Sequence, residues 1–352
     1  MKKSLAMLLA AALTLSVFLT GCSGSSSSSP ADKGEVNVYN WGVYIDESVL
    51  EQFTKETGIK VNYDTFESNE SMYGVIKNDG ASYDVVIPSD YMIGRMVSED
   101  MLEPLDFKNI PNASDLDESL KNPEYDPQNQ YSVPYMTGLM GIIYNRKIVT
   151  KTVDSWGIMF DKDYAGQILM FNNPRDAIGI ALKYLGYSLN TTNEAEIKEA
   201  VDLLVSEKPL VQSYVMDDIF DKLQGNVAAI GAYYYGDYLT MKEVNPDLEF
   251  CLPKEGTNRF VDAMCILKNA ENKDNAEKFI NFMCRTDIAL KNTETVCYST
   301  PMRSVKIVLK SELLKDPFAY PKQDILDKCE IYTNLPQETL DLYNTEWLRL
   351  KN

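Results

Sequence analysis

Short apolar stretches alternate with amphipathic stretches from residue 36 onward, which is the pattern of strands alternating with helices. The first helical stretch begins with Asp46 and Glu47, has Lys55 in its last turn and stops at Gly58, as the helix dipole and helix-stop preferences favour. Alternating units of this length predict an α/β fold with a parallel sheet covered by helices on both faces. The predicted strands are 36–41, 59–66 and 83–89, and the predicted helices are 46–58, 69–80 and 90–100.

A second α/β region starts near Gly138. One of its helices has Asn173 as predicted N-cap, Pro174 as first helical residue and Asp176 in the first turn. The apolar stretch 259–267 is predicted as a strand that returns to the first region. The remaining predicted elements are a strand at 167–172, a polar helix at 194–206, a strand at 227–234, a helix at 274–285 and a terminal helix from about 338 to 350.

Aromatic and polar residues stand at the carboxyl ends of these strands, where ligands bind in open α/β sheets. Trp41 and Tyr44 follow the first strand, the segment 89–91 follows the third, and Tyr233 and Tyr234 end a strand of the second region. A phosphate site would need glycines at such positions. An aromatic face instead attracts a cation, and a carboxylate adds a charge-assisted hydrogen bond. The pattern therefore favours an ammonium group over a phosphate.

Asp262 is the acidic residue that most strongly indicates a binding role, because it interrupts an otherwise apolar strand and an unpaired buried carboxylate is costly. Structural roles stay open for three other residues. Trp41 can be core packing, Tyr44 can cover the first helix, and Asp176 can serve only the helix dipole.

The amino terminus carries a targeting signal, predicted for residues 1–21. Two lysines precede an apolar run too short to span a bilayer comfortably, and the run ends in Leu-Thr-Gly-Cys. This tetrapeptide looks like a bacterial lipoprotein signal, in which cleavage leaves Cys22 as the lipid-bearing terminus; the alternative is an ordinary signal peptide with a chance cysteine. The serine-rich residues 22–34 are predicted to form a flexible tether after the lipidated Cys22.

Composition narrows the function classes. The formal net charge is −18, and −20 once Lys2 and Lys3 leave with the signal, which argues against a nucleic-acid partner. The chain has no histidine, which excludes His-dependent hydrolase triads and His-bearing zinc sites. The five cysteines after Cys22 have no CxxC spacing and are interpreted as structural thiols. We therefore expect neither a cofactor nor a metal.

Several blocks, among them YNWGVYID, LEQFTKETGIKVNYDTFESNESMY, YDVVIPSDYM, LGYSLNTT and YSTPM, resemble in the same order the spermidine/putrescine-binding proteins of bacterial ABC-type polyamine uptake systems. The likeness covers nearly all of residues 36 to 350. It implies a two-lobed, type II periplasmic-binding-protein-like fold, with hinge-connected lobes that close on a linear polyamine in the cleft between them. The predicted lobes are 35–138 plus about 262–310, and 139–261 plus about 311–352.

The resemblance also implies residue roles. Asp176 and Asp262 are the expected charge anchors, and Phe260 with Asp262 matches a Trp-x-Asp step that grips one terminal amine. Asn173 stands where some members have Asp, Gly42 replaces a hydroxyl residue, and Asp90 could restore a negative charge. The full predicted ligand-binding set is Trp41, Tyr44, Ser89, Asp90, Tyr91, Asn173, Asp176, Tyr233, Tyr234, Phe260, Asp262 and Tyr298.

The sequence thus predicts a receptor without catalytic activity, lipid-anchored outside the cytoplasm, that captures spermidine or putrescine as a monomer and presents it to an ABC permease. Rival hypotheses are a sugar or amino-acid receptor, and a ferric receptor using Tyr233 and Tyr234 as phenolates. A carboxylate-pair glycosidase and a purely structural or adhesive lipoprotein represent other classes.

Overall fold

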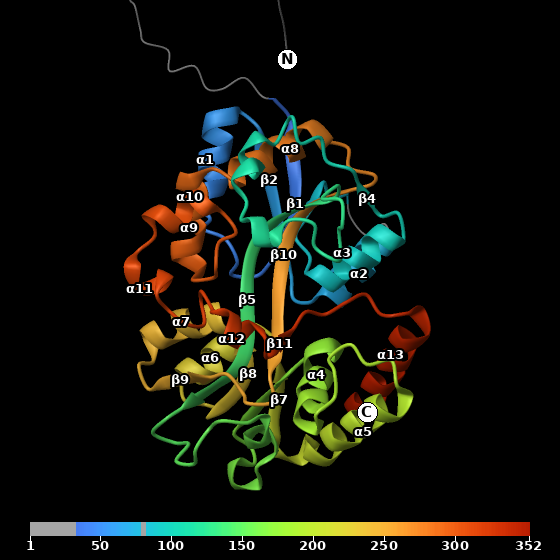
Figure 1. Cartoon of the computed structure of the whole chain (residues 1–352), viewed down its shortest axis with the longest axis vertical. Helices are drawn as coiled ribbons and strands as arrows, with labels where there is room; N and C mark the ends of the chain where they lie inside the picture. Colours follow the sequence, from blue (N-terminus) through green and yellow to red (C-terminus); the bar gives the residue numbers. More distant parts are fainter. Residues whose placement is uncertain (1–32, 79–81) are drawn as a thin grey trace, which may run out of the picture.

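The computed structural model describes residues 33–78 and 82–352 of the chain (Figure 1). The predicted signal peptide, Cys22 and nearly all of the serine-rich tether lie outside the described residues. The described strands form one mixed sheet in the order β2-β1-β3-β10-β5-β8-β6-β7, with β4 and β11 on β10 and β9 on β5. Their bounds are β1 Glu35–Trp41, β2 Lys60–Phe66, β3 Val85–Val86, β4 Leu102–Glu103, β5 Ser132–Asn145, β6 Ile168–Phe171, β7 Val211–Val215, β8 Ile230–Tyr234, β9 Leu248–Cys251, β10 Thr257–Leu267 and β11 Cys329–Glu330.

Helices gather around the two ends of this sheet, with β5 and β10 running between the two groups (Figure 1). Around β1 and β2 lie α1 Ser48–Thr57, α2 Asn69–Lys77, α3 Asp90–Ser98, α8 Lys273–Met283, α9 Thr286–Val296 and α10 Arg303–Val308. Around β6 to β8 lie α4 Pro174–Leu185, α5 Glu194–Glu207, α6 Ile219–Gln224, α7 Tyr235–Val244 and α13 Gln337–Lys351. Shorter helical segments are α11 Ser311–Leu314, α12 Gln323–Leu326, η1 Pro111–Asp115, η2 Glu118–Leu120, η3 Trp156–Phe160, η4 Lys162–Tyr164 and η5 Lys208–Leu210.

Local sequence signals fix the ends of two helices as predicted. Gly58 caps α1 in the left-handed conformation, at φ 77°. The side chain of Asn173 accepts a hydrogen bond from the backbone N–H of Asp176 at 2.9 Å, and Pro174 is the first residue of α4. The start of α4 is therefore held in one geometry, which aims the side chains of its first turn.

The expectation of a parallel sheet is wrong at the centre of the molecule. β1 runs parallel to β2 and β3, and β6 runs parallel to β7 and β8. However, β10 is antiparallel to both β3 and β5, and β5 is antiparallel to β8. These two long strands carry the chain between the two groups of helices in opposite directions. Gly138, expected to start the second region, lies in the middle of β5.

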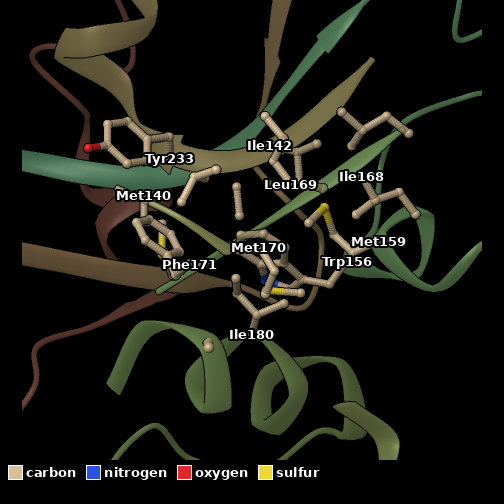
Figure 2. Packing of buried hydrophobic residues seen from close by; sticks show 14 of the residues in the cluster. Met140, Ile142, Trp156, Met159, Ile168, Leu169, Met170, Phe171, Ile180 and Tyr233 are labelled. Atoms are coloured by element: carbon tan, nitrogen blue, oxygen red, sulfur yellow. The ribbon is translucent and has the colours of Figure 1, made fainter. Parts of the chain in front are cut away.

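Separate hydrophobic cores define two lobes. In the second lobe, Trp156, Phe171 and Ile180 pack in a cluster that Figure 2 shows from close by. In the first lobe two clusters cover opposite faces of the sheet, since Val38 of β1 belongs to one and Tyr39 to the other. Each lobe therefore has its own hydrophobic core, and the cluster that contains Tyr39 also includes Leu189 and Tyr332 from the second lobe.

Candidate functional site

A pocket between the two lobes brings all twelve predicted residues together; we call it the interlobe pocket. It encloses about 750 Å³ of space, part of which is open to solvent. Its walls come from the loop after β1, the turn between β3 and α3, the start of α4, the end of β8, alternate residues of β10, and the turn after α9. The predicted residues that line it are Trp41, Tyr44, Ser89, Asp90, Tyr91, Asn173, Asp176, Tyr233, Tyr234, Phe260, Asp262 and Tyr298.

Asp262 is a buried carboxylate held by two hydroxyl groups. The Tyr44 hydroxyl donates to Oδ2 at 2.7 Å and the Ser89 hydroxyl donates to Oδ1 at 2.6 Å. Burial raises the pKa of Asp262 to about 6, against the lowering effect of these two hydrogen bonds. Asp262 forms no ion pair with any residue in the described part of the chain, so its charge has no protein partner.

The hydroxyls that hold Asp262 are themselves fixed. Asn69, at the start of α2, accepts a hydrogen bond from the Ser89 backbone N–H and donates to the Ser89 hydroxyl, both at 3.1 Å. The Tyr135 hydroxyl donates to the Tyr44 carbonyl at 2.7 Å. The carboxylate of Asp262 is therefore oriented before any ligand arrives.

Asp176 is the second buried acid of the pocket. Its Oδ2 accepts hydrogen bonds from the Tyr234 hydroxyl at 2.7 Å and the Asn173 amide at 2.9 Å. Burial raises its pKa, and the bonds to Tyr234 and Asn173 oppose the shift. Asp176 thus contacts the strand β8 across the pocket and lines its surface, which is more than the helix dipole alone would require.

Asp90 also lines the interlobe pocket, but its carboxylate has backbone partners. It accepts hydrogen bonds from the backbone N–H of Tyr91 at 2.7 Å and of Val261 at 3.1 Å. Burial raises the pKa of Asp90 to about 8. This side chain therefore holds α3 against β10 one residue before Asp262.

The aromatic side chains of the pocket contact one another mostly by edges. The Trp41 indole N–H donates to the Ile87 carbonyl at 2.8 Å, and the partly buried ring packs against both first-lobe clusters. The Tyr44 and Tyr298 ring centroids lie 5.0 Å apart at 87°. Trp41 and Tyr44 therefore both pack against the first-lobe core and line the pocket, and their binding roles stay predictions. Further ring contacts join Tyr233 to Tyr234 and Tyr234 to Phe260, and a longer one joins Phe260 to Tyr298.

The ferric hypothesis meets an electrostatic obstacle. The Tyr233 hydroxyl donates to Asp217 at 3.0 Å, and that of Tyr234 donates to Asp176. Burial raises the pKa of both phenols well above the usual value, and the neighbouring carboxylates raise it further. Forming two phenolates here is therefore opposed by the site itself.

Sequence reasoning missed several acidic residues of the pocket. Asp237 accepts a hydrogen bond from the Tyr298 hydroxyl at 2.7 Å, and burial raises its pKa to about 8. Asp217 follows the end of β7, a strand that was not predicted, so the strand-end rule was never applied there. A Cβ atom at Gly42 would collide with the Asp217 carboxylate, so the glycine leaves room for this acid. The seven carboxylates that line the pocket are those of Glu67, Glu70, Asp90, Asp176, Asp217, Asp237 and Asp262.

One buried cation lies behind the pocket wall. Arg175 is 3% exposed, and its guanidinium lies 4.5 Å from the Tyr332 ring centroid and 5.1 Å from that of Tyr91. Its charge lowers the pKa of both Glu70 and Asp176. Among the described residues that line the pocket itself there is no lysine or arginine. The pocket therefore combines acidic side chains, with no lysine or arginine in its described lining, and aromatic walls, which suits an elongated organic cation.

Comparison with known proteins identifies the family. The family model for the bacterial extracellular solute-binding protein matches residues 48–317. The spermidine/putrescine-binding periplasmic protein of Salmonella typhimurium is 36% identical over 331 residues, which cover 93% of this chain and 94% of that protein. A solved structure assigned to spermidine/putrescine ABC transport in Listeria monocytogenes has a TM-score of 0.87 and 41% identity, covering 90% of this chain and 98% of that one.

A third relative is the TpPotD lipoprotein of Treponema pallidum, whose structure has a TM-score of 0.79 and 27% identity and covers 90% of this chain and 99% of that one. These matches confirm the predicted periplasmic-binding-protein-like fold and the resemblance found in the sequence. They also place the chain among transport proteins that bind solutes, rather than among enzymes. The chain belongs to the bacterial extracellular solute-binding protein family and, within it, to the group of the spermidine/putrescine-binding proteins.

Proposed function

We propose that this protein captures a polyamine, spermidine or putrescine, in the interlobe pocket and delivers it to the permease of an ABC transporter. The observation that carries the proposal is the buried carboxylate of Asp262, which is oriented by Tyr44 and Ser89 and has no cationic partner in the described chain. The names of the relatives, spermidine/putrescine-binding proteins, support the same ligand class.

The proposed ligand-binding residues would contact the polyamine in two ways, through carboxylate charges and through aromatic rings. Asp262 would accept one terminal ammonium and Asp176 a second one. The rings of Trp41, Tyr234 and Phe260 would cover the alkyl chain and the faces of the ammonium groups. A desolvated cation–π contact contributes about 0.5 to 2 kcal/mol, and a hydrogen bond to a charged group contributes roughly 1.5 to 3 kcal/mol. A few such contacts reach the approximately −8 kcal/mol of a micromolar affinity after the costs of ordering and desolvation.

The first test is the thermal midpoint of the purified protein, alone and with spermidine, spermine, putrescine, cadaverine, lysine and maltose. A ligand at about 100 times its Kd adds roughly 2.7 kcal/mol to the stability of the native state, which shifts the midpoint by a few degrees. We expect a saturable rise with polyamines only. A rise with maltose or lysine but not with polyamines would contradict the proposal, and a tyrosinate absorbance with ferric salt would revive the iron receptor.

We also propose the division of the chain into lobes, at 35–138 plus about 262–310 and at 139–261 plus about 311–352. Two observations support it. Gly138 pairs with Phe260 where β5 and β10 cross between the lobes, and the pairing register shifts between Asp262 and Ala263. Tyr343 and Leu350 of α13 pack in the second-lobe core. Protection from hydrogen exchange should therefore change most at these crossing points when ligand binds.

Anchoring, location and assembly are part of the same proposal. We expect a lipid on Cys22, an extracytoplasmic location, and a monomer that docks on a permease. A lipoprotein among the solved relatives supports the anchor. Within residues 33–78 and 82–352, no helix is long and apolar enough to cross a membrane. Incorporation of labelled palmitate that is lost in Cys22→Ala would support the anchor, and light scattering of the purified protein tests the monomer.

A further inference from the structure

A second cavity lies on the opposite side of the strands that join the lobes; we call it the rear cavity. Successive residues of a strand point to opposite faces. On β10, Asp262 lines the interlobe pocket, Arg259 and Val261 line the rear cavity, and Phe260 borders both. The rear cavity encloses about 770 Å³, part of it open to solvent. It is lined by Ser119, Leu120, Thr137, Gly138, Leu139, Arg259, Phe260, Val261, Ser299, Thr300, Lys306, Phe318, Ala319, Tyr320, Pro321, Leu326 and Ile331.

The charge of the rear cavity is opposite to that of the interlobe pocket. Its described lining contains no aspartate or glutamate, although the whole chain carries a net charge of −18. Two cationic residues line it, and they differ. Lys306 is neutralised by Asp117, to which it donates at 2.7 Å. The guanidinium of Arg259 makes no hydrogen bond or ion pair within the described part of the chain, and its Nε is buried without a partner.

The Arg259 side chain is partly exposed at the cavity wall, and its buried Nε–H lacks an acceptor that an anion could supply. Its planar fork matches a carboxylate, which it can hold through two parallel hydrogen bonds. Because Arg259 is the one cationic side chain of the described lining without an acidic partner, we expect the rear cavity to favour ligands with one negative charge. The rest of the lining includes apolar side chains, among them Leu120, Phe318 and the nearly buried Leu139.

We propose that the rear cavity binds a small organic monoanion, with its carboxylate on Arg259 and its apolar body against Leu139 and Phe318. A polyamine would be repelled there by Arg259, so the two sites select ligands of opposite charge. The proposal goes beyond polyamine capture and does not depend on it.

The rear cavity is built from both lobes. Leu120 and Lys306 belong to the first lobe, while Phe318 and Leu326 follow the return to the second lobe in the division proposed above. A ligand that contacts both lobes favours the arrangement described here over one in which the lobes separate. Because coupling between two sites is reciprocal, a bound monoanion and a bound polyamine should then raise the affinity for each other by the same factor.

The test uses hexanoate and benzoate as probes on the purified protein, with hexylamine and inorganic phosphate as controls for charge and for apolar content. We expect a saturable rise of the thermal midpoint with the two carboxylates and none with hexylamine. Arg259→Gln should abolish the rise. Arg146→Gln removes the same charge from an exposed site that pairs with Glu249, and should leave the rise intact.

An equal response to hexanoate in wild type and Arg259→Gln would overturn the proposal, as would the absence of any response in wild type. If Arg259→Gln does not fold, Arg259→Lys keeps the charge and loses the fork, and should weaken hexanoate binding about tenfold; unchanged binding would overturn the proposal equally. Spermidine titrated with and without saturating hexanoate tests the coupling, and an identical spermidine Kd in both would refute it.

Discussion

Asp262 and Asp176, two of the buried acids that line the interlobe pocket, are held in different ways. Asp262 accepts one hydroxyl hydrogen bond on each of its oxygen atoms, from Ser89 and Tyr44. Asp176 accepts hydrogen bonds from the Tyr234 hydroxyl and the Asn173 amide on the same oxygen, Oδ2. Asp262 forms no ion pair within the described residues, whereas at Asp176 burial raises the pKa and the charge of Arg175 opposes that rise.

This difference separates a rigid anchor from an adjustable one. The Asp262 carboxylate is held in one orientation and forms no ion pair within the described chain, so we expect an ammonium group to gain most there. At Asp176 the positive charge of Arg175 already acts on the carboxylate that a ligand would meet. Neither the Tyr234 hydroxyl nor the Asn173 amide donates to Oδ1. Although both residues are aspartates of one pocket, we therefore expect Asp262 and Asp176 to contribute unequally to the binding free energy.

The largest effect is expected for Asp262→Asn. The amide keeps the size of the side chain but removes the charge that an ammonium group would meet, and losing one partner of a buried charged pair costs about 2 kcal/mol or more, or roughly 30-fold in affinity. Isothermal titration with spermidine and putrescine measures this.

The ligand-free Asp262→Asn protein should be at least as stable as wild type, because the substitution removes a buried charge without a cationic partner. Circular dichroism melting checks it. Unchanged polyamine affinity in a folded variant would reject the anchoring role of Asp262.

Asp176→Asn should weaken spermidine binding less, by about tenfold, because a single charge-assisted hydrogen bond contributes roughly 1.5 kcal/mol at the low end. Measured beside Asp262→Asn in the same titrations, this variant tests directly whether the two aspartates contribute unequally to spermidine affinity. An effect larger than that of Asp262→Asn would reverse the assignment of the rigid and the adjustable anchor.

A pH series should move affinity and stability in opposite directions. The pKa of Asp262 is about 6 in the folded protein against the usual 3.8, so the ligand-free fold binds an extra proton between these values and its stability from this group falls as the pH rises through them. Binding needs the ionised form. Lowering the pH from 7 to about 5.5 should therefore weaken spermidine binding about fourfold through Asp262 alone. Protonation of Asp176, whose pKa is also raised, adds to this loss.

Asp262→Asn is the control for the pH series, because it removes the largest part of the dependence. A pH profile of the variant parallel to that of wild type would assign the dependence to other groups. Titration at constant ionic strength is required, since charged ligands respond to salt as well.

The sequence predicted the pocket better than the sheet. The strand-end rule brought Trp41, Ser89 and Tyr234 to one place because it depends only on where strands stop. The strand-end rule could not give the direction of β10 or predict β5, because an apolar run has the same periodicity whichever way its strand pairs. Asp217 was missed with its strand β7.

Local sequence patterns could not show that Tyr332 lines the interlobe pocket. It reaches the pocket from a segment without regular structure near the C-terminus, and only tertiary packing against Arg175 and Tyr91 positions it. That Arg259 faces away from the interlobe pocket follows from strand alternation once Asp262 is known to face it, so this placement is predictable from the sequence.

The smallest expected effect is a difference in affinity between polyamines of different chain length. Asp262 and Asp176 offer positions for two ammonium groups, and Asp217 with Asp237 offers a further acidic position that only a longer polyamine needs. Because the pKa of Asp237 is about 8, the group is ionised only above that pH, and there Asp237→Asn should lower spermidine affinity about threefold, a loss near 0.65 kcal/mol. The putrescine affinity should stay within error. The Tyr298 hydroxyl can still donate to the amide oxygen in the variant, so the tyrosine ring next to Tyr44 keeps its place. An equal loss for both ligands would mean that Asp237 acts through the general field of the pocket, and the two-anchor description would then suffice for spermidine as well.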